Sequence, residues 1–180
     1  MAKRTKRNAK QKRKLARKVY FTALIIFAII AAITRYFFFE IHIITTAALE
    51  PAYLKGDVVV MIKFDMTTGN IARGDFVYTY YGSTDNKYLR IVRGVPGDLI
   101  DVREDGKYLV YKDNEGVMRE KNLGDAPALV HGEIPKDAYL LLADDLTVNA
   151  SDSRTLGLVY KTDINARPGP ILWPLQRAFR

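Results

Sequence analysis

The chain contains no cysteine and only two histidines, His42 and His131, among its 180 residues. The absence of cysteine excludes a disulfide scaffold, a cysteine-ligated structural zinc site and a thiol nucleophile. Two histidines are too few for a histidine-rich metal site, and no catalytic Ser-His-Asp arrangement can be assembled from them. Since no spacing of acidic residues suggests ligands either, the sequence predicts no metal and no other cofactor.

Basic residues are unevenly distributed along the chain. The first 18 residues hold ten of the 28 Lys and Arg residues and no acid, whereas the remainder holds 18 basic and 20 acidic residues. Alone, such an arm would indicate nucleic-acid binding. Because it directly precedes an apolar run, a membrane topology signal is favoured instead, and we expect no nucleic-acid partner.

The apolar run starts at Val19. Residues 19–34 carry no charge, Arg35 follows, and an aromatic cluster ends at Phe39. About 21 residues are enough to cross a hydrocarbon core roughly 30 Å thick. By the positive-inside rule, we expect a basic cytoplasmic arm over residues 1–18, a single-pass transmembrane helix over 19–39 and an extracytoplasmic, for example periplasmic, domain over 40–180. This topology predicts a protein of the inner (cytoplasmic) membrane.

A cleavable signal peptide is the alternative to a permanent anchor. Thr45 and Ala47 place small residues at the −3 and −1 positions of a possible cut after Ala47. Two features favour the uncleaved anchor, because the apolar run is long for a signal peptide and ends eight residues before that cut.

Short runs rich in β-branched and aromatic residues follow, separated by turns such as Asp105-Gly106, which indicates a hairpin. No segment after residue 40 has a convincing amphipathic-helix period, and the best candidate, 119–123, is too brief. The predicted fold class is therefore mainly β, with one amino-terminal transmembrane helix. The predicted strands span 58–64, 75–81, 88–93, 99–103, 108–112, 138–143 and 156–161.

Three stretches carry more information than strands and turns: ALEPAYLKGD at 48–57, YLRIVRGVPGD at 88–98 and SDSRTLGLV at 151–159. In this order, behind an anchor, they resemble the type I signal peptidase family of serine peptidases. Residues 164–174 also resemble that family's closing strand and Trp-Pro. The resemblance implies a β domain at the membrane surface, in which a serine nucleophile and a lysine base remove signal peptides from preproteins.

The same resemblance shows that the expected catalytic groups are replaced. The nucleophile position corresponds to Ala48, which has no side-chain oxygen, and the general-base position corresponds to Arg90, whose guanidinium cannot accept a proton. The serine that orients the base corresponds to Ala150, beside Ser151. Thr46, expected to share a strand face with Ala48, corresponds to a hydroxyl that helps to bind the oxyanion.

The turns around these positions keep the family's pattern. Gly94 to Asp98 would form a tight turn after the strand of Arg90, and Asp152 and Arg154 are candidates for a buried ion pair. We expect such residues to maintain the shape of the domain rather than to do chemistry. They are Pro51, Gly56, Asp57, Gly94, Pro96, Gly97, Asp98, Asp152, Ser153 and Arg154.

Three interpretations follow from these substitutions. In the first, a membrane-anchored signal peptidase homologue binds preprotein or pilin-like signal segments at the outer membrane surface without cleaving them, as a pseudoenzyme. In the second, the chain is a deliberately inactivated form of an active serine endopeptidase that removes signal peptides. In the third, it is a non-enzymatic assembly factor of a secretion or conjugation machine.

Overall fold

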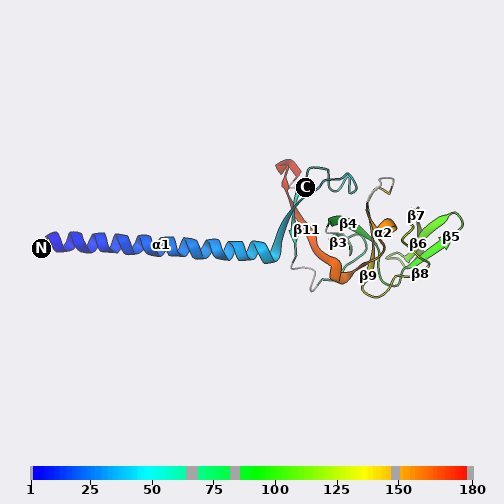
Figure 1. Ribbon diagram of the computed structural model, residues 1–180, viewed down its shortest axis with the longest axis horizontal. Coiled ribbons are helices and arrows are strands. Elements are labelled where there is room, and N and C mark those ends of the chain that lie inside the picture. The colour runs from blue at the N-terminus through cyan, green and yellow to red at the C-terminus, as the bar shows by residue number, and fades with distance from the viewer. Residues whose placement is uncertain (1, 64–68, 82–85, 147–150, 178–180) are drawn as a thin grey trace. The chain divides into compact units, whose positions relative to one another are not determined.

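The computed structural model describes residues 2–63, 69–81, 86–146 and 151–177. The chain divides into two compact units, residues 1–39 and 40–180. The first unit contains helix α1 (Ala2–Phe38), which is continuous through the basic arm and the apolar run (Figure 1). The helix therefore starts well before residue 19, the expected start of its membrane-spanning part, because the Lys- and Arg-rich arm itself consists of good helix formers.

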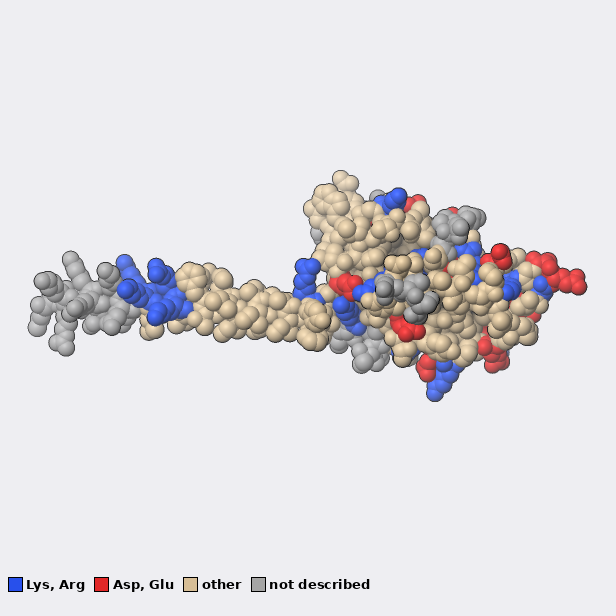
Figure 2. Space-filling model, viewed as in Figure 1, with Lys and Arg blue, Asp and Glu red and all other residues tan. Residues whose placement is uncertain are grey.

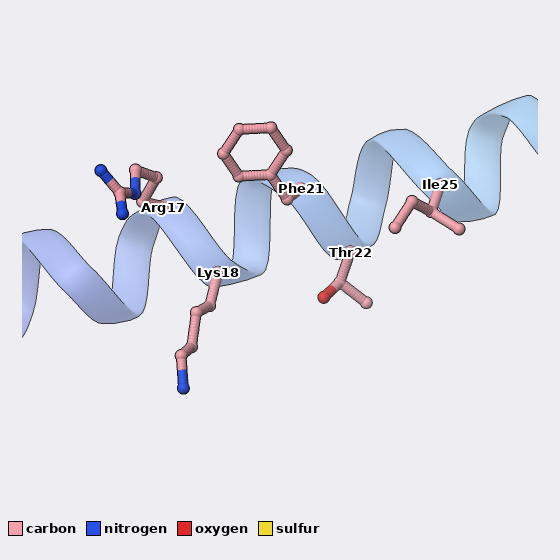
Figure 3. A pocket seen from close by; sticks show the side chains of 5 residues that line it. All are labelled: Arg17, Lys18, Phe21, Thr22 and Ile25. Atoms are coloured by element: carbon pink, nitrogen blue, oxygen red, sulfur yellow. The ribbon is translucent and has the colours of Figure 1, made fainter.

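Helix α1 changes from charged to apolar along its length. Figure 2 shows Lys and Arg gathered at residues 13–18 and a surface without Lys or Arg after them, until Arg35. A shallow hollow marks the change, with Arg17 and Lys18 beside Phe21, Thr22 and Ile25 on the same helix (Figure 3). The segment Arg13–Phe38 contains an 18-residue stretch with a mean hydropathy of 2.1 and is long and apolar enough to cross a membrane.

The second unit contains a seven-stranded sheet in the order β1-β2-β11-β3-β4-β9-β10. Its described neighbouring strands β2, β11, β3, β4, β9 and β10 pair antiparallel. The strands are β1 (Phe39–Ile43), β2 (Val58–Ile62), β3 (Phe76–Tyr80), β4 (Lys87–Gly94), β9 (Ala138–Leu142), β10 (Val159–Tyr160) and β11 (Ile164–Trp173).

A smaller four-stranded sheet has the order β7-β6-β5-β8 (Figure 1). Its strands are β5 (Leu99–Arg103), β6 (Gly106–Lys112), β7 (Met118–Gly124) and β8 (Gly132–Glu133). The hairpin predicted at Asp105-Gly106 is confirmed, because Arg103 and Gly106 form the last pair between β5 and β6. Two short 3₁₀ helices, η2 (Lys161–Asp163) and η3 (Leu175–Arg177), flank β11.

The two sheets share a core through β9. All five residues of this strand are buried, which explains why its sequence is continuously apolar. Tyr139 and Leu141 pack in one cluster, whereas Ala138, Leu140 and Leu142 pack in another with residues of β5, β6 and β7. The strand thus joins the small sheet to the large one and fixes the position of the segment that follows it.

Several predicted elements have different limits or types in the structure. β2 ends at Ile62, and Phe64, the predicted end of that strand, lies outside the described residues. The segment predicted as a strand over 156–161 starts as a helical turn, α2 (Ser153–Leu156), because the Asp152 carboxylate accepts a hydrogen bond from the Arg154 N–H and caps that turn. Only Val159 and Tyr160 remain as a strand.

Gly94 is the last residue of β4, and neighbouring side chains leave no room there for a side chain. A Cβ atom there would lie 2.6 Å from Ile134 Cδ1 and 2.7 Å from Leu140 Cβ. We expect Gly94→Ala to lower the free energy of unfolding by about 1–3 kcal/mol through overpacking. Urea unfolding of the full chain in detergent, followed by circular dichroism, measures this, and an unchanged midpoint would show that the space is not limiting.

Candidate functional site

Residues 48–57 form a compact corner whose carboxyl-terminal end is bound to Ile44. The Ile44 N–H donates to the Asp57 carbonyl and the Gly56 N–H donates to the Ile44 carbonyl, both at 2.8 Å. Gly56 has a φ of +96°, a conformation that residues with a side chain rarely adopt. The corner is therefore a closed loop held against the strand that follows helix α1 in sequence.

Asp57 anchors this corner from inside. Its side chain is 2% exposed and accepts a hydrogen bond from the Leu54 N–H at 2.8 Å. Arg177, 120 positions later in the chain, donates to the same carboxylate at 2.6 Å and to the Ala52 carbonyl at 3.0 Å. The carboxyl-terminal 3₁₀ helix thus clamps the corner, a contact that no short-range sequence signal indicates.

Ala48, at the predicted nucleophile position, is fully buried. Its methyl group packs with Ala143, and its carbonyl accepts a hydrogen bond from the Asp144 N–H at 2.7 Å. Asp144 in turn forms an ion pair with Arg93 of β4. The corner is therefore fixed to the segment after β9 by the backbone of the residue where a nucleophile would be expected.

Arg90, at the predicted base position, is 4% exposed. Its Nε and Nη2 atoms donate to the Ser151 carbonyl at 3.0 and 2.8 Å, and Nη1 donates to the Leu89 carbonyl at 2.6 Å. The guanidinium also lies 5.1 Å from the centre of the Tyr88 ring. Burial lowers the pKa of Arg90, but a guanidinium remains protonated near neutral pH. Arg90 is therefore a buried cation that donates hydrogen bonds to two main-chain carbonyls.

The predicted ion pair between Asp152 and Arg154 is present and buried, with 3.0 Å between Oδ2 and Nη2. The Asp152 carboxylate also accepts from the Ala143 N–H at 3.1 Å, and the Ser153 hydroxyl accepts from the Leu141 N–H at 3.0 Å. These contacts join helical turn α2 to the end of β9. They determine the path of the segment that carries Ser151 towards Arg90.

The turn after β4 is held by Asp98. This carboxylate accepts from the Val95 N–H at 2.7 Å and forms two hydrogen bonds of 2.7 Å with Arg73. Gly97 has a φ of +88°, and its N–H donates to the Ile134 carbonyl. Pro96 is exposed at the tip. The turn therefore joins the end of β4 to Arg73, before β3, and to Ile134, directly after β8.

A pocket of about 240 Å³ lies between the start of the corner and the start of β4. One wall is formed by the segment after β1 and the other by the first half of β4. The lining residues are His42, Ile44, Thr45, Thr46, Leu49, Asn86, Lys87, Tyr88, Leu89 and Arg90. Both predicted key regions, the corner and the strand of Arg90, thus contribute to one pocket.

The pocket is bordered by two strand edges. β1 is the outermost strand of its sheet. Residues 87–90 of β4 pair with β3, whereas pairing with β9 starts only at Ile91. On that side, residues 87–90 have no strand partner in the part of the chain that the structure describes. Edges of this kind can accept an added strand.

Charged and aromatic groups gather at the end of the pocket near His42. Lys87 Nζ lies 2.6 and 2.8 Å from the two Glu40 oxygens, and Lys63 Nζ lies 3.1 Å from that carboxylate. Burial alone would raise the pKa of Glu40, but hydrogen bonds from the two lysines outweigh it and lower this pKa. Burial lowers the pKa of His42, which lies 2.9 Å from the Tyr78 hydroxyl. His42 is therefore neutral at pH 7.

Thr46 does not share an extended strand face with Ala48, as expected from the sequence. Residues 46–50 form a bend and turn, in which Thr46 is exposed and Ala48 is buried. The prediction was wrong because β1 ends at Ile43 and the chain turns towards Pro51 before reaching Ala48. Thr46 lines the pocket nevertheless, and Ala150 lies outside the described residues.

Among the described residues, no group of three or more His, Asp or Glu side chains lies close enough to bind a metal ion. The arrangement around the pocket instead offers main-chain edges, hydroxyl groups and fixed cations. These features suit recognition of an extended peptide.

Comparison with known proteins identifies the family. Residues 17–173 match the signal peptidase family, peptidase S26. The chain belongs to this family. It is 30% identical over 178 residues to signal peptidase I P of Bacillus subtilis subsp. natto, covering 93% of this chain and 96% of that protein.

Two further signal peptidases and a solved structure also match the chain. Signal peptidase I T of Bacillus subtilis strain 168 is 26% identical over 76% of this chain and 75% of its own length. Signal peptidase IB of Staphylococcus aureus is 26% identical over 71% of this chain and 74% of its own length. A crystal structure of a signal peptidase I from Enterococcus faecalis V583 matches 55% of this chain and 97% of that chain, with 19% identity and a TM-score of 0.40.

Proposed function

We propose that this signal peptidase homologue binds a preprotein or pilin-like signal segment at the outer surface of the cytoplasmic membrane without cleaving it. The observation that carries the proposal is the chemistry of the two key positions. Ala48 offers no oxygen to attack a carbonyl, and the guanidinium of Arg90 is held by the Ser151 and Leu89 carbonyls. A protonated guanidinium donates hydrogen bonds but cannot take a proton from a nucleophile.

The pocket supports the binding part of this function. An extended segment between β1 and residues 87–90 of β4 would lie beside two strand edges that have no further strand partner among the described residues. Main-chain hydrogen bonds would provide affinity, and the pocket near Ile44 and Leu49 would select side chains by size. The family membership makes a signal segment the natural occupant.

The amino-terminal helix supports the proposed location. Four cations, at positions 13, 14, 17 and 18, directly precede the apolar part of α1. The positive-inside rule places this end in the cytoplasm and the β domain on the outer side. The pocket would then lie close to the surface at which signal segments leave the membrane, because the segment after β1 follows the helix within a few residues.

An active peptidase is the second candidate, and the contacts that hold the segments around the expected catalytic positions favour it. Asp57, Asp98 and the Asp152–Arg154 pair hold the corner, the turn and α2 in place, although the groups expected to react are absent. If the two substitutions are the only obstacle, the chain carrying Ala48→Ser together with Arg90→Lys regains cleavage. No gain of cleavage would indicate that the surrounding site has also changed.

Site-specific crosslinking tests the binding proposal. The chain has no cysteine, so Thr45→Cys in the pocket wall can be labelled uniquely with a photoactivated benzophenone. We expect the full chain in detergent to crosslink to a preprotein through its signal segment. Lys136→Cys, on an exposed loop before β9, is the matched control and is expected not to crosslink. Equal labelling from both positions, or none from Thr45→Cys, would contradict the proposal.

A further inference from the structure

The walls of the pocket carry positive charge and no acid. Lys87 and Arg90 both line it, and none of the lining residues is Asp or Glu. His42, on the opposite wall, is neutral at pH 7 because burial lowers its pKa. An occupant with a negative charge would therefore meet two cations and no opposing carboxylate within the lining itself.

Arg90 has an incomplete set of partners for a buried cation. Its three described hydrogen-bond contacts go to main-chain carbonyls, and no carboxylate forms an ion pair with it among the residues that the structure describes. Asp152 acts on Arg90 through its charge, but this carboxylate is bound to Arg154. A buried charge without a paired counter-charge is costly, so an anion arriving beside Arg90 would be stabilising.

Lys87 shares its counter-charge with a second lysine. Glu40 is bound by Lys87 and by Lys63, so one carboxylate serves two ammonium groups. Among the described residues around the pocket, Lys63 and Lys87 thus share Glu40, and Arg90 is held by main-chain carbonyls. These contacts leave an excess of positive charge at the pocket.

We propose that the pocket binds a carboxylate of the peptide that occupies it. The proposal rests on the function proposed above and specifies the chemistry of the occupant. A guanidinium and an ammonium on one wall form strong charge-assisted hydrogen bonds to carboxylate oxygens. The exposed hydroxyl groups of Thr45 and Thr46, on the other wall, can donate to the same group.

Two sources supply this carboxylate. One is an acidic side chain within an uncut segment, and the other is the carboxyl terminus of a segment already released by another peptidase. Four synthetic decapeptides separate these sources. They share an alanine-rich extended sequence and a neutral amino-terminal dye, and they end either in a free acid or in an amide. Within each pair, one central position is Glu or Gln.

Fluorescence anisotropy with the full chain in detergent at low salt measures the four affinities. We expect at least one carboxylate-bearing peptide to bind about tenfold more tightly than the neutral Gln amide, which corresponds to one charge-assisted contact. A gain for the free acid indicates a terminal carboxylate, and a gain for the Glu amide indicates a side chain. The gain should shrink as salt rises.

The results that would contradict the carboxylate proposal differ from those that would contradict peptide binding. Equal affinities for all four peptides would overturn the carboxylate proposal and leave peptide binding intact. Binding of none of them would overturn both this proposal and the binding function.

Substitution of one cation tests the site on the protein side. Lys87→Gln is expected to reduce the preference for the carboxylate peptide at least threefold, because it removes an ammonium and leaves Glu40 to repel the ligand. Lys136→Gln, which removes an exposed lysine outside the pocket lining, is the control and should keep the preference. An unchanged preference in Lys87→Gln would contradict the assignment of the pocket as the carboxylate site.

Discussion

Replacing Asp152 with alanine is expected to lower the free energy of unfolding of the β domain by about 3–5 kcal/mol, the usual cost of removing one partner of a buried ion pair. The Asp152 carboxylate is fully buried and accepts hydrogen bonds from the Ala143 N–H, the Arg154 N–H and the Arg154 guanidinium. Without it, the Arg154 guanidinium loses the contact with this carboxylate, and α2 loses its cap. Urea unfolding of the full chain in detergent measures the change.

Two variants make the Asp152 experiment specific. Asp152→Asn keeps an acceptor oxygen without the charge and should recover part of the loss. Glu120→Ala removes a carboxylate that is 49% exposed and bound to Arg103, and it should change stability little, because exposed ion pairs contribute little. If Asp152→Ala unfolded at the same urea concentration as Glu120→Ala, the buried pair would not stabilise the domain.

Arg177→Ala is expected to have the second-largest effect, a loss of about 3 kcal/mol, since it leaves the buried Asp57 carboxylate without its charged partner. Arg177 also donates to the Ala52 carbonyl, so the corner itself would loosen. Amide hydrogen exchange measures this directly. We expect faster exchange of the Gly56 and Asp57 N–H groups, which donate to the Ile44 and Leu54 carbonyls.

Arg103→Ala is the matched control for Arg177→Ala. Arg103 makes ion pairs with Asp101 and Glu120, but its side chain is 40% exposed, compared with 19% for Arg177. Its removal should leave both the unfolding midpoint and the exchange of the corner unchanged. A corner that exchanges equally slowly in wild type and in Arg177→Ala would show that the carboxyl-terminal clamp is dispensable.

The local sequence pattern predicted the parts of the fold that carry a turn signal or a continuous apolar run. The hairpin at Asp105-Gly106 and the fully apolar β9 follow directly from turn chemistry and burial. β7 could not be predicted, because Leu123 is the only buried residue among its seven and the strand is held by pairing with β6. The helical turn α2 was missed because its start depends on the Asp152 side chain and not on a periodic pattern.

The sequence indicated the key positions of the site but not the long-range hydrogen bonds that join them to the rest of the domain. Family resemblance indicated Ala48 and Arg90 as key positions, and the structure places the corner and the Arg90 strand around one pocket. The contact of Arg177 with Asp57 spans 120 positions and has no sequence signal. Nor could the sequence predict that Arg90 donates to two carbonyls, because those contacts depend on the path of the segment before α2.

The substitution of arginine for the expected lysine changes the character of the site. A lysine without its proton could serve as a base, whereas Arg90 remains a cation that holds the Ser151 carbonyl in place. The same side chain that removes the proposed base therefore supplies positive charge to the pocket. If the proposed function holds, the two strand edges bind the peptide and the position expected to hold the base serves recognition.

Intact-mass measurement of a preprotein after prolonged incubation with the full chain tests the central claim most directly. The preprotein should have small residues before its cleavage site, and a mock preparation should control for contaminating peptidases. We predict that the preprotein mass stays unchanged, while the chain carrying Ala48→Ser and Arg90→Lys serves as the comparison for a restored site. Release of a signal peptide by the unsubstituted chain, above the mock preparation, would contradict the account.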